Sequence, residues 1–218
     1  MNRIGIDEAG RGPVIGPLIV AGVSLDAETA VKFKAAGVKD SKLLSQKKIF
    51  LLERLVVENS LGYMTEKISP ESIDSRFKDG TNLNFLELDK MADIANKLPG
   101  ETVIIDCPSS NTKKIKAFMT KKIPNKELVV ENYADKNFIE VSAASIVAKA
   151  LREREVAAIK KELGYDFGSG YPSDPRTVKF LKIIKENGLI MEEKYRKNIR
   201  GTWATLRNLE NKDLHDFL

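Results

Sequence analysis

The stretch from Ile4 to Pro13, IGIDEAGRGP, constrains the fold more than any other part of the chain. Its apolar, β-branched start is typical of a buried strand, which we expect to run from Arg3 to Asp7. The glycines and the proline then end the strand and bring bare backbone to the surface. A turn at this point would aim the adjacent carboxylates of Asp7 and Glu8 at one place, where they suit a divalent cation. A solvated polar turn is the alternative.

Composition narrows the class of protein. The 218 residues are 42% hydrophobic and only 7% aromatic, which indicates one large domain or a domain with an extension, built on an aliphatic core. The net charge of +5 favours a polyanionic partner without proving one. Most of the excess falls in residues 176–208, which hold nine Lys and Arg against three Glu.

Several kinds of chemistry are excluded by what the sequence lacks. Cys107 is the only cysteine and His215 the only histidine, so Ser-His-Asp, Cys-His and zinc-histidine sites are ruled out. An internal disulfide is ruled out too, which indicates a reducing compartment. No apolar run approaches 18 residues and no signal peptide precedes the first strand. We therefore expect a cytoplasmic protein with no membrane partner.

Strand-like and helix-like segments are mixed along the chain, which predicts an α/β fold with a mixed central sheet flanked by helices. We expect strands at 3–7, 14–25, 62–68, 102–105 and 128–130. We expect helices at 28–36, after Ser45, after Pro70, and at 82–98, 112–122, 138–163 and 176–187. The basic helical part after Pro175 reads as an extension of this domain.

Acidic residues follow three of these predicted strands. Asp7, Asp106 and Asp135 each stand at or just beyond a carboxyl end, where ligands bind in open α/β sheets. Together with Glu8 they would repel one another unless cations were bound. Two Mg²⁺ or Mn²⁺ ions would balance four carboxylates, and such a pair suits in-line displacement at phosphorus. Taken singly, Asp135 could cap a helix and Asp106 could be a turn residue.

Six motifs occur in order within the first 175 residues, and together they make the chain resemble ribonuclease HII (type 2 ribonuclease H) of the archaeal kind. They are Gly5–Gly12, Lys39–Lys42, Ile105–Asp106, Ala134–Asp135, Val141–Lys149 and Gly168–Pro175. The resemblance implies a ribonuclease H-like catalytic domain over 1–175 and a basic helical extension over 176–210. One departure is Asn132-Tyr133, where many relatives have His-Lys.

The resemblance also implies an activity. It is endonucleolytic cleavage of the RNA strand of RNA/DNA hybrids, and cleavage on the 5′ side of ribonucleotides embedded in duplex DNA, leaving a 3′-hydroxyl and a 5′-phosphate. The family's catalytic, metal-binding acids match Asp7, Glu8, Asp106 and Asp135. We expect a monomer.

Substrate contacts are implied at several further positions. The backbone of Gly10, Arg11 and Gly12 would read the 2′-hydroxyl and a phosphate, and Tyr171 would stack on the sugar at the RNA–DNA junction. Lys42, Ser142 and Ser145 are further candidates, although solvation explains the lysine and close packing explains the serines equally well. Lys179, Lys182 and Lys185 recur every three residues, which predicts phosphate binding by one helix face or a merely solvated face.

The tail, residues 211–218, resembles the peptide by which proteins bind the sliding clamp. Asn211, Leu214, Phe217 and Leu218 would make the contacts, and the alternative is that this turn packs on its own domain. Two other functions stay open on the sequence alone. One is a different ribonuclease H-like nuclease of the resolvase type, and the other is a non-catalytic, hybrid-binding clamp adaptor.

Overall fold

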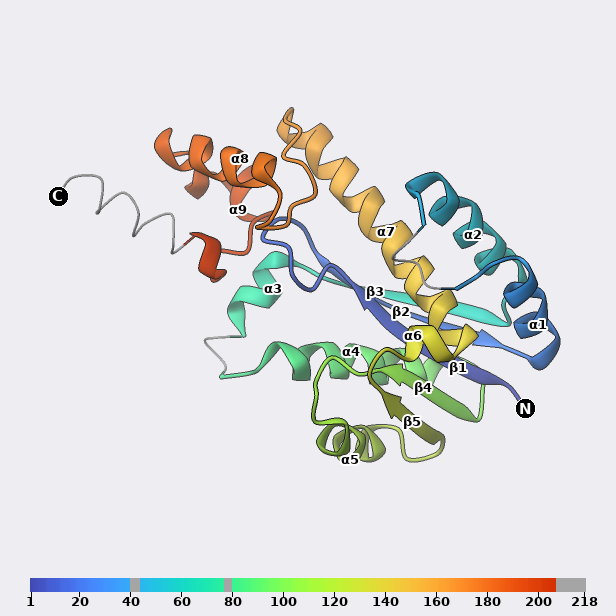
Figure 1. The fold of residues 1–218 in the computed structure, drawn as a ribbon. Coiled ribbons are helices and arrows are strands. Elements are labelled where there is room, and N and C mark those ends of the chain that lie inside the picture. Colours follow the sequence, from blue (N-terminus) through green and yellow to red (C-terminus); the bar gives the residue numbers. More distant parts are fainter. Residues whose placement is uncertain (40–43, 77–79, 207–218) are drawn as a thin grey trace. The chain divides into compact units, whose positions relative to one another are not determined.

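The computed structural model describes residues 1–39, 44–76 and 80–206. Its strands form a five-stranded sheet in the order β3-β2-β1-β4-β5 (Figure 1). The strands are β1 Arg3–Ala9, β2 Leu18–Leu25, β3 Gly62–Ile68, β4 Thr102–Asp106 and β5 Glu127–Glu131. β1 pairs antiparallel with β2 and parallel with β4, and β4 pairs parallel with β5. The sheet is therefore mixed, as the sequence predicts.

The helices begin where side chains can cap them. Ser45 caps α2, Asn82 caps α4 and Asp174 caps α8, each by accepting a hydrogen bond from a backbone N–H of the first turn. The helices are α1 Ala27–Ala35, α2 Gln46–Asn59, α3 Pro70–Ser75, α4 Leu83–Lys97, α5 Thr112–Lys122, α6 Ala134–Asn137, α7 Ile139–Leu163, α8 Pro175–Glu186 and α9 Glu193–Arg196, with a 3-10 turn η2 at Leu189–Met191. In the described residues, no helix is long and apolar enough to span a membrane.

The chain forms two compact units that are interleaved in sequence. The first comprises Met1–Ala9, Ile19–Lys67 and Thr81–Leu151, and the second comprises Gly10–Leu18, Ile68–Gly80 and Arg152–Leu218. The first unit holds nearly all of the sheet. The domain boundary predicted after residue 175 stays a prediction.

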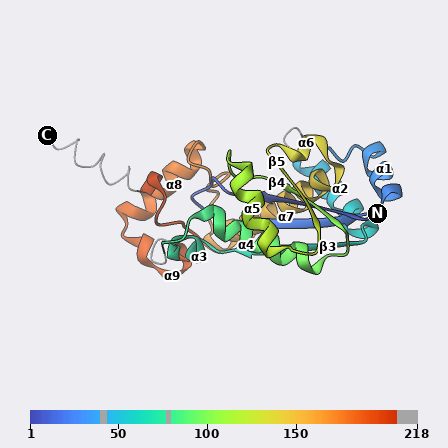
Figure 2. The ribbon, with the colours of Figure 1, turned by 90° about the horizontal axis from the view of Figure 1, so that it is seen from below.

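Helices cover both faces of the sheet in the first unit. Helices α1, α2 and the start of α7 lie on one face, where Val23, Phe33, Leu52 and Val147 are part of one buried cluster (Figure 1). Helices α4 and α5 lie on the other face (Figure 2). Covering on both faces explains why β4 is apolar at almost every position.

Two glycines let helices approach the sheet closely. A Cβ on Gly5 would lie 2.0 Å from the backbone carbon of Glu140, so the start of α7 packs directly on β1. A Cβ on Gly22 would lie 2.3 Å from the Ile94 side chain of α4. The contact at Gly5 brings the first turns of α7 to the same face of β1 as Asp7, two residues further on.

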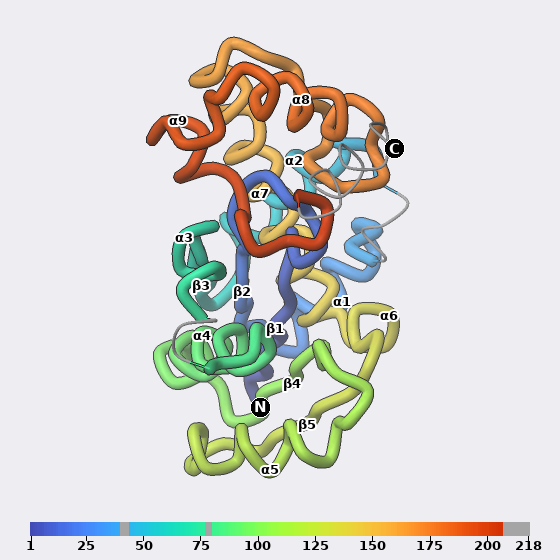
Figure 3. The backbone as a smooth tube through the Cα atoms, turned by 90° about the vertical axis from the view of Figure 1, so that its left-hand side faces the viewer, coloured from blue at the N-terminus to red at the C-terminus, as the bar shows by residue number. Residues whose placement is uncertain are grey.

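The second unit has its own core. The ring of Phe180 packs against those of Tyr165, Phe167 and Tyr195, with centroid separations of 4.9, 5.7 and 6.2 Å. In Figure 3 the segment near residue 200 lies against the loop that follows β1. Backbone hydrogen bonds join the two, from the Arg200 N–H to the Val14 carbonyl and from the Gly16 N–H to the Asn198 carbonyl.

These bonds account for a difference from the predicted strands. The second strand begins at Leu18, four residues later than the apolar run suggests, because residues 14–16 pair with Gly170 and with the C-terminal segment. β1 is also longer than predicted and continues to Ala9. The apolar pattern identifies buried residues but not the segment against which they are buried.

Candidate active site

Three predicted acids meet at the carboxyl ends of the parallel strands. Asp7 lies on β1 and Asp106 ends β4, while Asp135 lies in α6 just beyond β5. The register pairs Ile6 with Ile105, which places Asp7 and Asp106 next to each other. One carboxylate oxygen of each acid lies within 4.8 Å of those of the other two.

Burial makes this cluster electrostatically unfavourable without a cation. Asp7 is 5% exposed and Asp135 is 2% exposed. The pKa of Asp7 is raised well above its ordinary value, first by burial and then by the nearby charges of Glu8 and Asp106. Hydrogen bonds from Ser145 and from the Glu8 N–H act in the opposite direction. Burial likewise raises the pKa of the neighbouring Cys107 thiol.

Glu8 is placed differently from the other three acids. β1 continues past it, so Asp7 and Glu8 point to opposite faces of the strand instead of turning together. Glu8 pairs with Val20 in the register and does not belong to the group of three within 4.8 Å. Its charge is nevertheless close enough to raise the pKa of Asp7. Its role as a ligand stays a prediction.

The backbone around Asp135 is held in an unusual conformation. Tyr133 has φ +60° and ψ +35°, and among described residues it is the only non-glycine with a positive φ. The Ala134 N–H then donates to Asp106 Oδ1 at 3.2 Å, which ties the start of α6 to the end of β4. A left-handed non-glycine residue beside a functional acid is a common site of stored strain.

Asn132 fixes the same corner through its side chain. Its Nδ2 donates to the carbonyls of Cys107 and Ser109, at 3.0 and 2.9 Å. Both residues thus have structural roles in this chain, because Asn132 bonds the backbone of the segment after β4 and Tyr133 adopts the left-handed turn. The sequence drew attention to these residues only through the family resemblance.

Two serines of α7, Ser142 and Ser145, form hydrogen bonds with the predicted acids. Ser142 Oγ donates to the carbonyl of Asp135 at 2.5 Å, and Ser145 hydrogen-bonds the carboxylate of Asp7. Both are buried. These contacts favour a role in orienting the acids over the predicted direct contact with substrate.

The donor set fits a hard divalent cation. All three clustered groups are carboxylates, with no cysteine or histidine ligand among them, and Mg²⁺ and Mn²⁺ prefer such oxygen ligands. A bound cation would also offset the repulsion that raises the pKa of Asp7.

The predicted substrate-reading residues of the second unit also come together. A Cβ on Gly12 would lie 3.3 Å from the Tyr171 ring, so ring and loop are in contact. Gly10 has φ +88°, and a Cβ there would lie 2.8 Å from the Pro17 carbonyl oxygen. Both its conformation and its surroundings therefore require glycine at this position.

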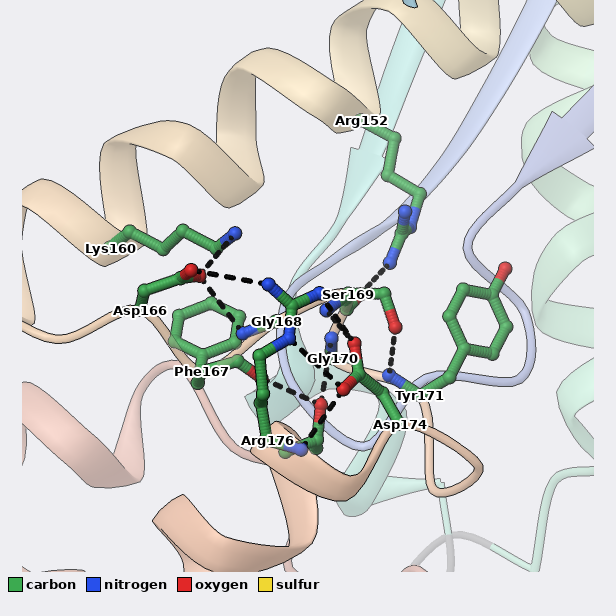
Figure 4. Close-up of polar contacts among 11 residues, drawn as sticks. Arg152, Lys160, Asp166, Phe167, Gly168, Ser169, Gly170, Tyr171, Asp174 and Arg176 are labelled. Atoms are coloured by element: carbon green, nitrogen blue, oxygen red, sulfur yellow. Dashed lines mark hydrogen bonds and ion pairs between the residues drawn. The ribbon is translucent and has the colours of Figure 1, made fainter. Parts of the chain in front are cut away.

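A polar network supports the loop that carries Tyr171 (Figure 4). Asp174 Oδ2 accepts from the Ser169 N–H at 2.8 Å, and the Arg176 guanidinium contacts both Asp174 and Asp166. The Arg176 side chain, together with the backbone N–H groups of Ser169 and Arg176, holds the pKa of Asp174 far below its ordinary range. The loop is thus shaped by its own side chains before any substrate binds.

Arg152 is a site residue that sequence reasoning missed. It is buried, donates to the Ser169 carbonyl at 2.8 Å, and places its guanidinium carbon 5.0 Å from the centre of the Tyr171 ring. In sequence it sits on the polar side of a long helix, where a charged residue normally faces water. Only the fold reveals that this position faces Tyr171.

The three lysines of α8 are separated by the structure. Lys179 and Lys182 are exposed and line a hollow together with Pro172 and Ser173. Lys185 is half-buried and lines a different hollow, which also contains Glu71 and Asp74. Lys42 and the four tail residues Asn211, Leu214, Phe217 and Leu218 lie outside the described residues.

The mixed sheet with three clustered carboxylates at its strand ends defines a ribonuclease H-like nuclease, a hydrolase that depends on divalent cations. The sequence profile described as Ribonuclease HII matches residues 4–205. The chain belongs to the ribonuclease HII family, whose members cleave RNA in RNA/DNA hybrids using Mg²⁺ or Mn²⁺.

Individual relatives agree over almost the whole chain. Ribonuclease HII of Thermococcus sibiricus is 40% identical over 97% of this chain and 92% of its own length. The crystal structure of ribonuclease H2 from Pyrococcus horikoshii OT3 is 33% identical, with a TM-score of 0.86 and coverage of 97% and 98%. The PCNA:RNase HII complex from Archaeoglobus fulgidus matches with 37% identity, a TM-score of 0.83 and coverage of 93% and 95%.

Proposed function

We propose that Asp7, Glu8, Asp106 and Asp135 are the catalytic, metal-binding acids of this ribonuclease H. The observation that carries the proposal is the meeting of three carboxylates from β1, β4 and α6 within 4.8 Å, with Asp7 and Asp135 buried and Asp106 half-buried. When bound, two divalent ions supply an activated water and stabilise the leaving oxygen. The protein's part is to hold the acids in register, through strand pairing and through Ser142 and Ser145.

The substrate includes ribonucleotides embedded in duplex DNA as well as longer hybrids, and the cut falls on their 5′ side, leaving a 3′-hydroxyl and a 5′-phosphate. Support comes from the contact of Tyr171 with Gly12, because the pair offers an aromatic face for a sugar beside backbone donors for a 2′-hydroxyl. Gly10 follows Glu8 by two residues and Asp7 by three, so the residues proposed for recognition and for chemistry are adjacent along the chain.

The deciding experiment uses a duplex with one ribonucleotide, incubated with and without Mg²⁺, with the cut mapped at nucleotide resolution. We expect a Mg²⁺-dependent cut on the 5′ side of the ribonucleotide and no cut in an all-DNA duplex. Cutting of an all-DNA four-way junction would indicate a resolvase-type nuclease instead. Binding of the hybrid without any cleavage would indicate a non-catalytic adaptor.

We also propose that residues 211–218 tether the enzyme to the sliding clamp. The support is twofold: an archaeal relative 37% identical to this chain was solved in complex with PCNA, and the tail carries the motif-like set Asn211, Leu214, Phe217 and Leu218. Three apolar side chains at this spacing share one side of a helical turn. The test is clamp binding before and after removal of these residues.

A further inference from the structure

Arg200 is a fully buried cation in the second unit, with 0% of its side chain exposed. Its guanidinium donates to three backbone carbonyls of the loop after β1: Gly10 at 2.6 Å, Arg11 at 2.8 Å and Gly16 at 3.0 Å. Burying a charged group is costly unless it is hydrogen-bonded. The rigid fork of arginine donors matches three carbonyls in a way that a lysine ammonium does not.

Trp203 completes this arrangement. Its Nε1–H donates to the Gly12 carbonyl at 3.1 Å, and the Arg200 guanidinium carbon lies 4.9 Å from the centre of its ring. Asp74 anchors the connecting residues by accepting from the backbone N–H groups of Gly201 and Thr202, at 2.6 and 3.2 Å. The segment from Arg200 to Trp203 therefore binds the carbonyls of Gly10, Arg11 and Gly12, three consecutive residues of the loop.

The direction in which these carbonyls point also fixes the direction of the backbone N–H groups in the same loop. The described peptide bonds are all trans, and in a planar trans peptide the C=O and the following N–H point in opposite directions. Carbonyls of Gly10 and Arg11 that point at Arg200 thus turn the N–H groups of Arg11 and Gly12 away from it. Pro13 has no N–H, so the third peptide contributes only its carbonyl to Trp203.

We propose that Arg200 and Trp203 are positioning residues that aim the N–H groups of Arg11 and Gly12 at the ribose 2′-hydroxyl and the adjoining phosphate. The inference rests on the proposed function of the Gly10–Gly12 loop and deepens it by naming what sets its geometry. Recognition of a 2′-hydroxyl by backbone donors needs the donors fixed in advance, because a flexible loop would bind DNA and RNA backbones alike.

Two conservative variants test the proposal. Trp203→Phe keeps an aromatic ring beside Arg200 but removes the donor to Gly12. Arg200→Lys keeps the charge but cannot reach three carbonyls with one ammonium. The matched control is Asn198→Ala, two residues before Arg200, because the Asn198 side chain hydrogen-bonds Glu162 and the Lys194 carbonyl instead of the loop carbonyls.

The readout is the ratio of affinities for an RNA/DNA hybrid and an all-DNA duplex of the same sequence, measured in EDTA, alongside kcat/KM with Mg²⁺ and the Tm. We expect Trp203→Phe to lower the affinity ratio about tenfold, and Arg200→Lys to lower it further, with DNA affinity unchanged. Asn198→Ala should keep the wild-type ratio of hybrid to DNA affinity, even if its Tm falls.

A fall in Tm with an unchanged affinity ratio in both variants would show that Arg200 and Trp203 only hold the fold together, and would overturn the proposal. This outcome differs from failure of the proposed function, in which the wild-type protein itself would neither prefer nor cleave the hybrid.

Discussion

At Asp7, burial disfavours the charged form of the carboxylate, whereas binding of a cation would require that form. Burial of the carboxylate raises its pKa, and the charges of Glu8 and Asp106 raise it further. Such a group destabilises the folded protein at neutral pH unless a cation is bound. Activity and stability should therefore respond differently to the loss of this charge.

We predict that Asp7→Asn lowers kcat/KM at least about a hundredfold while duplex binding persists, because the substitution removes a metal ligand and leaves the phosphate-binding groups in place. In EDTA at neutral pH the variant should have a higher Tm than wild type, because one buried charge is gone. Cleavage assays and thermal unfolding with and without Mg²⁺ measure both effects. Cleavage within tenfold of wild type would contradict the assignment of Asp7.

Tyr171 offers a second test at the residue scale. We predict that Tyr171→Ala reduces cleavage at a single embedded ribonucleotide more than cleavage of a long hybrid, because only the former must present an RNA–DNA junction to the ring. Tyr171→Phe, which keeps the ring against Gly12 and Arg152, serves as the control and should retain most of the junction preference. Equal losses on both substrates for Tyr171→Ala would argue against junction reading.

At the scale of elements, α8 is joined to the Tyr171 loop through its own N-cap. Asp174 caps the helix and accepts the Ser169 N–H, and the Arg176 side chain is the main reason for its lowered pKa. A carboxylate with a lowered pKa in the folded state stabilises the fold at every pH above its ordinary value. That contribution disappears as the pH falls through the lowered pKa.

Accordingly, Asp174→Asn should lower the Tm at pH 7, and the gap from wild type should close as the pH drops below about 4. Thermal unfolding between pH 7 and pH 2.5 measures this, with Asp93→Asn, an exposed acid of α4, as the matched control. A gap that stays constant over this range would mean that the Asp174 charge contributes nothing.

A further prediction concerns duplex binding by the exposed lysines of α8. Lys179 and Lys182 share a hollow that Lys185 does not line. We expect the double variant Lys179→Ala, Lys182→Ala to flatten the slope of log K against log salt by about 0.9 for each phosphate that is no longer bound. Lys185→Ala is the control and should change the slope less. Identical slopes for all three proteins would mean that this face is only solvated.

At the scale of the whole molecule, the C-terminal part of the chain combines two adjacent segments of opposite charge. The positive excess lies in residues 176–208, while the last ten residues are net negative. A negative, apolar tail is suited to a protein partner and not to a nucleic acid backbone.

Removing residues 211–218 should abolish binding to the sliding clamp and leave cleavage of a short free duplex near the wild-type rate. Clamp binding by surface plasmon resonance, cleavage and Tm are measured on the same two proteins. If the truncated protein still binds the clamp and unfolds at a markedly lower temperature, the tail is part of the fold and the tether lies elsewhere.

Local features were readable from the sequence because their causes are local. The four-residue apolar run before Asp106, the capping serine of α2 and the proline that opens α3 each act within one turn or one strand, and the structure has them where expected. The placement of acids at strand ends follows from the same short-range signals. The mixed sheet was likewise predictable from the order of the segments.

The remaining features depend on which distant segments meet, and no local pattern encodes that. The pairing of β1 with β4, about a hundred residues later in the chain, is what brings Asp7 beside Asp106. Arg152 beside Tyr171 and Arg200 beneath Gly10 look in sequence like ordinary charges on polar segments. The sequence alone thus determined which acids are candidates for the chemistry, because acids that follow strands can be recognised from short-range patterns. Only tertiary packing, in which hydrogen bonds compensate buried charges, decided what holds them in place.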